Sequence, residues 1–145
     1  MVETRQLKVG ESAALVELFD AVLPGFAGAL VDATGPAAFL EDPASFVFGA
    51  YDNGTPTGLA WGIHMRSPNG RLTTYLHELD VREPWRRRGI ASALVREAMA
   101  LARRHGSARF WLSTGGHNDV AQALYQSLGG DRNPLGDVNY RWNLD

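Results

Sequence analysis

One stretch of the sequence, Tyr75 to Met99, constrains the fold more than any other, because a strand, a basic loop and a helix follow one another within it. Apolar residues alternate as far as Val81, and helical spacing begins after Gly89. The first N–H groups of a helix have no partner inside the helix, and the helix dipole makes that end partly positive. The stretch is therefore predicted to bind an anion, such as a phosphate group, where the helix begins.

The loop within this stretch contains the residues that we expect to hold the anion. Gly89 allows the backbone to approach closely, and the small side chain of Ala91 avoids crowding. Positive charge comes from Arg86, Arg87 and Arg88. The loop does not have the glycine spacing of the P-loop or of the dinucleotide-binding fingerprint. A solvated run of surface charge is the alternative interpretation of the three arginines.

The composition is that of an ordinary soluble protein, with a single domain expected over residues 1–145. The net charge of −2 argues against bulk nucleic-acid binding. Because the sequence has no cysteine, disulfides, cysteine metal sites and a cysteine nucleophile are excluded. The sequence shows neither a leader peptide nor an apolar run of about 20 residues, the length that spans a bilayer. We therefore expect a cytoplasmic protein with no membrane partner.

Hydrophobic periodicity and turn residues predict how strands and helices alternate along the chain. Three consecutive strands joined by hairpins must be antiparallel, whereas the strand–helix–strand crossover that follows makes its two strands parallel. The sequence therefore predicts an α/β fold with a mixed, mostly antiparallel sheet and helices on both faces. Strands are expected at 2–9, 45–51, 57–65, 72–81, 108–113 and 138–144, and helices at 11–23, 36–41, 90–105 and 119–128.

Two motifs resemble those of the GNAT superfamily of N-acetyltransferases. Arg86-x-x-Gly89-x-Ala91, after Leu79-Asp80-Val81, is similar to the superfamily's pyrophosphate loop. The segment from Asn118 to Gly129 is similar to its Asn-x-x-Ala-x-x-x-Tyr-x-x-x-Gly helix, and the predicted order of elements also matches. The resemblance implies acetyl-CoA as co-substrate and no metal cofactor. It assigns coenzyme binding to Leu79, Asp80, Val81, Arg86, Arg87, Arg88, Gly89, Ile90, Ala91, Asn118, Ala121 and Tyr125.

Within the superfamily, the segment from Leu79 to Gly129 is most similar to the aminoglycoside 3-N-acetyltransferases. The chain departs from that group at residues 115–118, where those enzymes tend to be acidic, so the antibiotic specificity stays open. In the superfamily the motif asparagine contacts the pantetheine or pyrophosphate arm and the tyrosine lies near the coenzyme sulfur, which here implies Asn118 and Tyr125. The local sequence also allows plainer roles, a helix N-cap for Asn118 and a packed aromatic ring for Tyr125.

Acetyl transfer to an amine requires a base, because a free alkylammonium has a pKa near ~10 and only the neutral nitrogen attacks. Glu78 and His77 lie on the strand expected beside the coenzyme, and each resembles a residue that part of the superfamily uses. Adjacent residues of a regular strand point to opposite faces, unless a β-bulge intervenes. We prefer Glu78 as the base, with His77 as the alternative, and expect Tyr125 to protonate the departing thiolate. The plainer reading of Glu78 and His77 is a partly buried polar residue satisfied by its neighbours.

The acceptor is encoded less clearly than the coenzyme. Acidic residues in the N-terminal helical region, together with Glu78, would form a negative funnel for a cationic amine, or else are simply solvated; they are Asp20, Asp32, Glu41 and Asp42. Trp61, Phe26 and Trp111 either line the cleft or fill the core. His64, His105 and His117 lack the spacing of metal ligands.

We predict an enzyme that transfers the acetyl group of acetyl-CoA to the primary amine of a small cationic acceptor, with an aminoglycoside as one candidate. The reaction is expected to proceed by direct attack in a ternary complex. A protein or peptide N-acetyltransferase and a non-catalytic acetyl-CoA-binding regulatory module are the alternatives. A homodimer is left open.

Overall fold

The computed structural model describes residues 1–133 and 138–144. The chain divides into two compact units, Met1–Ser113 and Thr114–Asp145, and each is described by itself. Within the described residues, the first unit contains β1 (Val2–Gln6), α1 (Ser12–Val22), α2 (Gly35–Glu41), β2 (Ser45–Asp52), β3 (Thr55–Arg66), β4 (Leu72–Val81), α3 (Ile90–Arg104) and β5 (Arg109–Leu112). These bounds lie close to the predicted ones.

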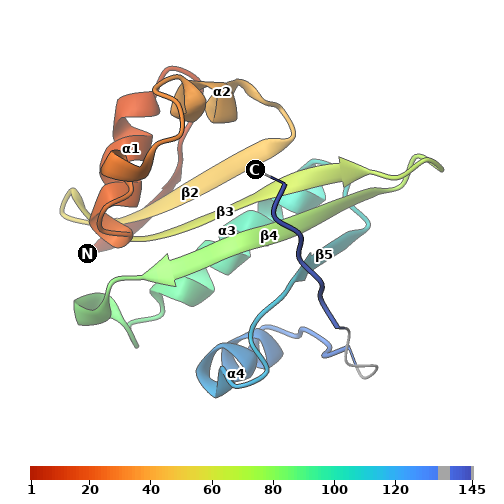
Figure 1. The fold of residues 1–145 in the computed structure, drawn as a ribbon. Helices are drawn as coiled ribbons and strands as arrows, with labels where there is room; N and C mark the ends of the chain where they lie inside the picture. Colours follow the sequence, from red (N-terminus) through yellow and green to blue (C-terminus); the bar gives the residue numbers. More distant parts are fainter. Residues whose placement is uncertain (134–137, 145) are drawn as a thin grey trace. The chain divides into compact units, whose positions relative to one another are not determined.

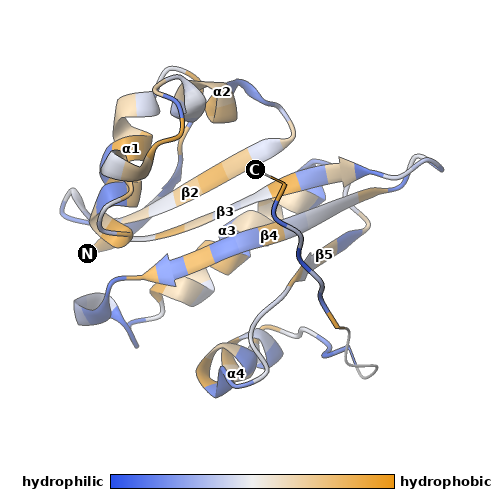
Figure 2. Ribbon diagram, in the orientation of Figure 1, coloured by the Kyte–Doolittle hydropathy of each residue, from blue (hydrophilic) through white to orange (hydrophobic). Residues whose placement is uncertain are grey.

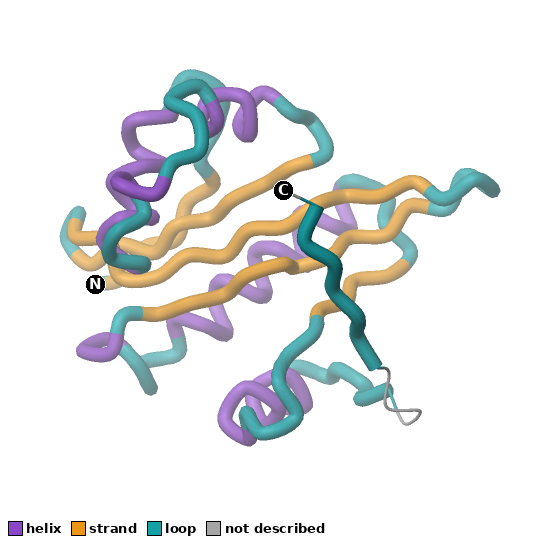
Figure 3. The backbone as a smooth tube through the Cα atoms, viewed as in Figure 1, coloured by secondary structure: helices purple, strands orange, loops and turns teal. Residues whose placement is uncertain are grey.

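The sheet of the first unit has five strands in the order β1-β2-β3-β4-β5 across the described residues (Figure 1, Figure 3). β1, β2, β3 and β4 pair antiparallel, and β4 and β5 pair parallel. The turn between β2 and β3 follows from its sequence, since Asn53 and Gly54 both have positive φ, 48° and 85°. Two such residues form the tight hairpin turn whose twist matches that of the strands. The predicted mixed, mostly antiparallel sheet is confirmed.

The helices of the first unit cover both faces of this sheet, with α1 and α2 on one face and α3 on the other (Figure 1). The apolar residues of α1 pack against Val47 and Leu59, and this cluster is shielded from water. α3 buries one stripe of residues at helical spacing, namely Ile90, Leu94, Val95, Ala98 and Ala102. In Figure 2, apolar colour is prominent on α1 and β2, whereas the middle of β4 is hydrophilic.

A β-bulge interrupts the pairing of β3 with β4. Trp61 lies opposite Glu78, but the next residue, Gly62, lies opposite Leu76, so His77 is an extra residue on β4. Gly62 permits this irregularity, because a Cβ atom there would overlap the carbonyl oxygen of Tyr75. The bulge shifts the alternation of side chains along β4 by one position.

The pairing of β4 with β5 is short compared with β4 itself. The parallel ladder runs from Thr73 opposite Arg109 to Leu76 opposite Leu112, whereas β4 continues to Val81. Within residues 1–113, the outer edge of β4 from His77 to Val81 therefore carries no strand partner. Apart from those of Val81, which Arg86 and Asp80 contact, the backbone groups on such an edge remain open to a ligand.

The second unit contains α4 (Asp119–Ser127), close to the predicted helix. The strand predicted at 138–144 is wrong for the described residues, which are assigned neither to a strand nor to a helix. Val138, Tyr140, Trp142 and Leu144 alternate as in a strand, but all four side chains are exposed. Alternation alone predicted the strand, whereas a strand also needs a hydrogen-bonded neighbour.

Candidate active site

The loop between β4 and α3 has the backbone conformation of an anion-binding concavity. After a 3-10 turn over Glu83–Trp85, Arg87 has a φ of 64° and Gly89, the N-cap of α3, has a φ of 79°. Residues in the left-handed region that alternate with ordinary ones turn successive N–H groups towards one point. No side chain in the described part of the chain caps α3. The first N–H groups of the helix are therefore left for a ligand.

The three loop arginines differ in their contacts. Arg86 donates from Nε to the carbonyl oxygen of Val81 at 2.8 Å, and its Nη2 lies 3.8 Å from Asp80 Oδ1. This side chain therefore fastens the loop to the end of β4. Partial burial raises the pKa of Asp80, an effect that a hydrogen bond from the Val81 N–H and, less strongly, the charge of Arg86 oppose. Arg87 and Arg88 are exposed and free to contribute charge.

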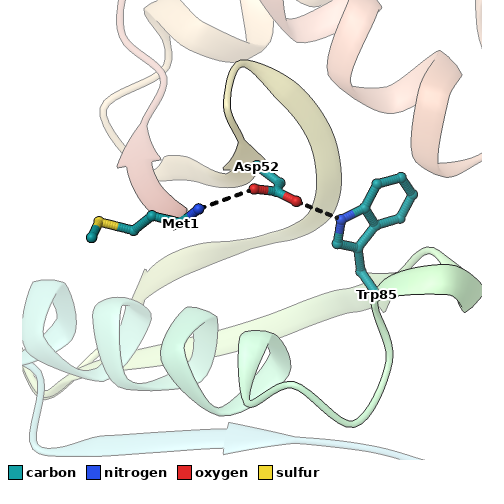
Figure 4. A network of polar contacts seen from close by, with 3 residues as sticks. All are labelled: Met1, Asp52 and Trp85. Carbon is teal, nitrogen blue, oxygen red and sulfur yellow. Dashed lines mark hydrogen bonds and ion pairs between the residues drawn. The ribbon is translucent and has the colours of Figure 1, made fainter.

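A second set of contacts holds the loop from the side of the β2–β3 hairpin (Figure 4). The Trp85 indole Nε1 donates to Asp52 at 3.1 Å, and the amino group of Met1 lies 3.3 Å from the same carboxylate. The Trp85 hydrogen bond, more than the amino terminus, lowers the pKa of Asp52. Arg82 packs over the Trp85 ring at 4.8 Å and donates to the Pro56 carbonyl. Residues on both sides of the β2–β3 turn thus hold the loop in place.

The β-bulge brings both candidate bases to the same face of β4. Glu78 accepts a hydrogen bond from Trp61 Nε1 at 2.9 Å, while the His77 ring stacks on Trp61 with centroids 4.3 Å apart. A regular strand would separate the two residues. The geometry places both beside the open edge of β4 and does not choose between them.

Trp61 is also part of a continuous row of rings, which we call the aromatic wall: Phe39, Trp61, His77, Tyr75 and Trp111. Phe39 meets Trp61 edge-on at 5.6 Å, and Tyr75 meets His77 edge-on at 5.8 Å. At the far end, Tyr75 and Trp111 lie 4.2 Å apart, and Trp111 is 41% exposed. Of the three aromatics considered from the sequence, Trp61 and Trp111 belong to this wall. Phe26 packs on Phe19 in the α1 core at 4.8 Å.

Three of the four acidic residues of the predicted funnel make local backbone contacts instead. Asp20 accepts from Ala27 N at 2.9 Å, Asp32 from Thr34 N at 2.7 Å, and Asp42 from Ala44 N at 2.9 Å. Each contact stabilises a turn, which is an ordinary role for aspartate. The three aspartates therefore have local structural roles while keeping their charge, and Glu41, the fourth residue, is exposed.

Three further residues of the predicted coenzyme site, Asn118, Ala121 and Tyr125, belong to the second unit. Asn118 is the N-cap of α4, with its side-chain oxygen accepting from Ala121 N at 3.0 Å. The capping role that the sequence allowed is thus present. Burial raises the pKa of Tyr125, so its phenol keeps the proton at neutral pH.

Sequence reasoning missed the contacts that support the site. The hydrogen bond between Trp85 and Asp52 joins residues 33 positions apart, so no local pattern predicts it. The ring contacts of Phe39 and Tyr75 with other elements are equally non-local. The sequence does place rings at the alternate positions Tyr75 and His77 of one strand. Such a pattern does not show which rings of other strands lie beside them.

Two other features of the chain bear on function. Within residues 1–133 and 138–144, no group of three or more His, Asp or Glu residues is placed to hold a metal ion. Over the same residues, no helix has the length and apolar character needed to cross a membrane. The buried His64 instead hydrogen-bonds Thr74 and stacks on His105.

Comparison with known proteins identifies the class to which this fold and site belong. The sequence profile of the acetyltransferase (GNAT) family matches residues 14–130. The chain therefore belongs to the acetyltransferase (GNAT) family. This confirms the family and the enzyme class, an acetyl-CoA-dependent N-acetyltransferase, that the motifs predicted. The sequence has no significant match among curated proteins.

Solved structures share the fold at low sequence identity. An aminoglycoside acetyltransferase from an uncultured soil metagenomic sample is 21% identical, with a TM-score of 0.87 and 99% of each chain covered. The aminoglycoside N-acetyltransferase AAC(6')-Iy, solved with a bisubstrate analogue of CoA, is 20% identical, with a TM-score of 0.79 and 99% of each chain covered. A ribosomal-protein-alanine N-acetyltransferase from Brucella melitensis is 17% identical, with a TM-score of 0.73 and 98% and 100% covered. The neighbours include aminoglycoside acetyltransferases of the 6' type, and they do not single out the 3-N type.

Proposed function

We propose that the protein transfers the acetyl group of acetyl-CoA to the primary amine of a small cationic acceptor, by direct attack in a ternary complex. One observation carries this proposal. The bulge in β4 puts Glu78 and His77 on the face beside an unpaired strand edge, and the same strand leads directly into the anion-binding loop. The candidate base and the open backbone edge thus lie on β4, and the candidate phosphate site lies in the loop that follows it.

The coenzyme is expected to lie along this strand and loop. The open edge at Leu79 and Asp80 offers backbone groups to the pantetheine amides. Val81, which the resemblance also assigns to coenzyme binding, has its carbonyl oxygen bonded to Arg86 Nε and would need to exchange that contact. The loop from Arg86 to Ala91 offers N–H groups, the helix dipole and the exposed guanidiniums of Arg87 and Arg88 to the pyrophosphate. The family resemblance also assigns Asn118, Ala121 and Tyr125, in the second unit, to coenzyme binding.

The reaction needs three events that these residues are suited to perform. Glu78, directly or through water, removes a proton from the ammonium, and the freed nitrogen forms a bond to the acetyl carbon. The C–S bond then breaks and the thiolate leaves with the electron pair, while the nitrogen releases its second proton to solvent, from which Tyr125 is reprotonated after it has donated to the sulfur. The Tyr125 hydroxyl is proposed to supply a proton or hydrogen bond to the sulfur, a role consistent with its raised pKa. His77 replaces Glu78 in the alternative mechanism.

The nature of the acceptor separates the competing functions. An aminoglycoside is one candidate, because several neighbours of similar fold are aminoglycoside acetyltransferases. The fold is also shared by a ribosomal-protein-alanine N-acetyltransferase, which keeps a protein acceptor as the second candidate. The 3-N regiochemistry predicted from the motifs is a further, untested refinement.

Two measurements test this proposal together. Calorimetry with acetyl-CoA measures binding, and release of free thiol over a panel of amines, aminoglycosides and peptides measures turnover. Binding with amine-dependent thiol release is the expected result. Binding without release from any amine would instead indicate a regulatory module, and no binding at all would contradict the coenzyme site.

A further inference from the structure

From the aromatic wall we infer the chemical class of the acceptor: a monoamine whose ammonium group is joined by a short linker to an aromatic or other flat apolar body. This inference rests on the proposed function and adds to it the part of the acceptor that does not react. The wall, with Glu78 at its centre, is the recognition surface.

The rings of the wall form one unbroken row across three strands and α2. Successive centroid distances are 5.6 Å from Phe39 to Trp61, 4.3 Å from Trp61 to His77, 5.8 Å from His77 to Tyr75, and 4.2 Å from Tyr75 to Trp111. His77 and Trp111 are exposed and the others are only partly buried, so ring surface remains accessible to a ligand. An aromatic row left open to water on an otherwise well-covered sheet is a candidate surface for a flat apolar group.

The charge of the wall matches a single ammonium group. Glu78 is held within the row by the indole N–H of Trp61, which leaves its second carboxylate oxygen for a ligand. The next carboxylate along β4, Asp80, lies 3.8 Å from Arg86. Asp20, Asp32 and Asp42 accept hydrogen bonds from backbone N–H groups of their own turns. Among the described residues, Glu78 is thus the carboxylate that is hydrogen-bonded to a ring of the wall, and the ring faces themselves attract cations.

This balance disfavours a polyamino sugar. Each additional ammonium group that leaves water needs its own carboxylate or hydrogen-bond partners, since an unpaired buried charge is costly. A monoamine with an aromatic body uses every part of the wall: the ammonium meets Glu78 and the ring faces, and the body stacks along Tyr75 and Trp111. The Trp61 indole has two functions, because it contributes ring surface and orients the Glu78 carboxylate.

The test compares three acceptors at saturating acetyl-CoA: 2-phenylethylamine, n-butylamine and sisomicin. We expect kcat/KM for 2-phenylethylamine to exceed that for each of the other two by about tenfold, the size of a favourable aromatic contact. Trp111→Leu should reduce the ratio of phenylethylamine to butylamine about fivefold. Trp111→Phe, which keeps a ring, should restore most of this ratio. Val31→Ala, a change at an exposed apolar residue outside the wall, should leave the ratio unchanged.

Several outcomes would overturn the inference. If sisomicin or a peptide α-amine is the best acceptor, or if Trp111→Leu reduces turnover of both monoamines equally, the acceptor is not recognised by the wall. These results would leave acetyl transfer itself intact. Failure to bind acetyl-CoA in calorimetry, or thiol release that no amine stimulates, would instead overturn the proposed function and this inference with it.

Discussion

At the scale of single residues, the side chains of Glu78 and His77 are adjacent in sequence and also share a face. Each contacts Trp61, one by a hydrogen bond and the other by stacking. The two residues therefore compete for one role, and a change at either affects the surroundings of the other. The kinetics of separate substitutions can show which of the two residues is the base, because only loss of the base removes the proton acceptor.

Glu78→Gln tests the preferred base. It keeps the size of the side chain and an oxygen for the Trp61 indole, but cannot accept a proton. We expect kcat/KM for the amine to fall by about 10²- to 10⁴-fold, the usual loss for a general base. The acidic limb of the pH–rate profile should also flatten. His77→Asn is the matched control, and a large loss there with little loss in Glu78→Gln would move the role to His77.

Tyr125→Phe removes one hydroxyl and almost no volume. If the phenol protonates the departing thiolate, kcat should fall while acetyl-CoA affinity stays nearly constant, because the contact matters most as charge develops on sulfur. Burial raises the pKa of Tyr125, so the acid is present throughout the neutral range. The loss should be partial and smaller at high pH. Unchanged kcat from pH 6 to 9, with chemistry rate-limiting, would remove Tyr125 from the mechanism.

At the scale of elements, the bulge in β4 determines which side chains meet. It depends on Gly62, where the backbone of β4 approaches so closely that a side chain has no room. The neighbouring ring of Phe46 would lie only 2.8 Å from an added Cβ. The site is therefore coupled to a residue that carries no chemistry of its own.

Gly62→Ala should destabilise the protein by about 2 kcal/mol or more, because the overlap involves backbone and cannot be relieved by a side-chain rotation. Urea denaturation measures the loss. Gly28→Ala is the matched control, because nothing lies within 4 Å of an added Cβ there. A Gly62→Ala protein as stable as the wild type would show that the two strands can separate at the bulge without cost.

The loop before α3 is the second element that can be tested as a unit. Arg86→Ala together with Gly89→Asp should weaken acetyl-CoA binding strongly. The first change releases the anchor to Val81, and the second strains a residue with a φ of 79° and places a carboxylate where the anion is expected. Calorimetry measures the affinity, and circular dichroism checks the fold. Unchanged affinity in a folded double variant would refute the loop assignment. Arg96→Ala, on the exposed face of α3, serves as the control.

At the scale of the whole molecule, stability should depend on pH through one buried histidine. Burial, with a smaller effect from His105, lowers the pKa of His64 from 6.5 to about 4. The unfolded chain then binds a proton below pH 6.5 that the folded protein excludes down to about pH 4. The free energy of unfolding should therefore decrease by roughly 1 to 3 kcal/mol as the pH falls through this range.

His64→Gln provides the comparison, because it keeps a polar group near Thr74 and removes the titration. Carboxylates with lowered pKa values, such as Glu11 and Asp52, also lose stability on acidification in both proteins, so the difference between the two curves isolates His64. Urea denaturation at pH 7 and pH 4.5 is sufficient. An equal loss of unfolding free energy in the wild type and in His64→Gln would show that folded His64 does not exclude the proton.

Much of the fold could be predicted from the sequence, because periodicity and turn residues are local signals. The Asn53-Gly54 hairpin, the stripe of α3 and the start of the loop all follow from neighbours in the chain. The face shared by Glu78 and His77 could not be predicted with certainty, since the bulge arises from Gly62 on another strand. The contact of Asp52 with Trp85 is equally non-local. At 138–144 the alternating pattern predicted a strand, but the described residues are not paired with another strand.

The unpaired edge of β4 and the turn at Arg87 to Gly89 share one property: both offer main-chain atoms. Every residue except proline carries the same N–H and C=O groups, so mutation can alter the surrounding side chains without removing these main-chain atoms. Recognition of one constant cofactor can then persist in a lineage whose acceptor pockets diverge. A solved structure that is only 21% identical shares the fold over 99% of this chain, so the backbone path is the same where most side chains differ.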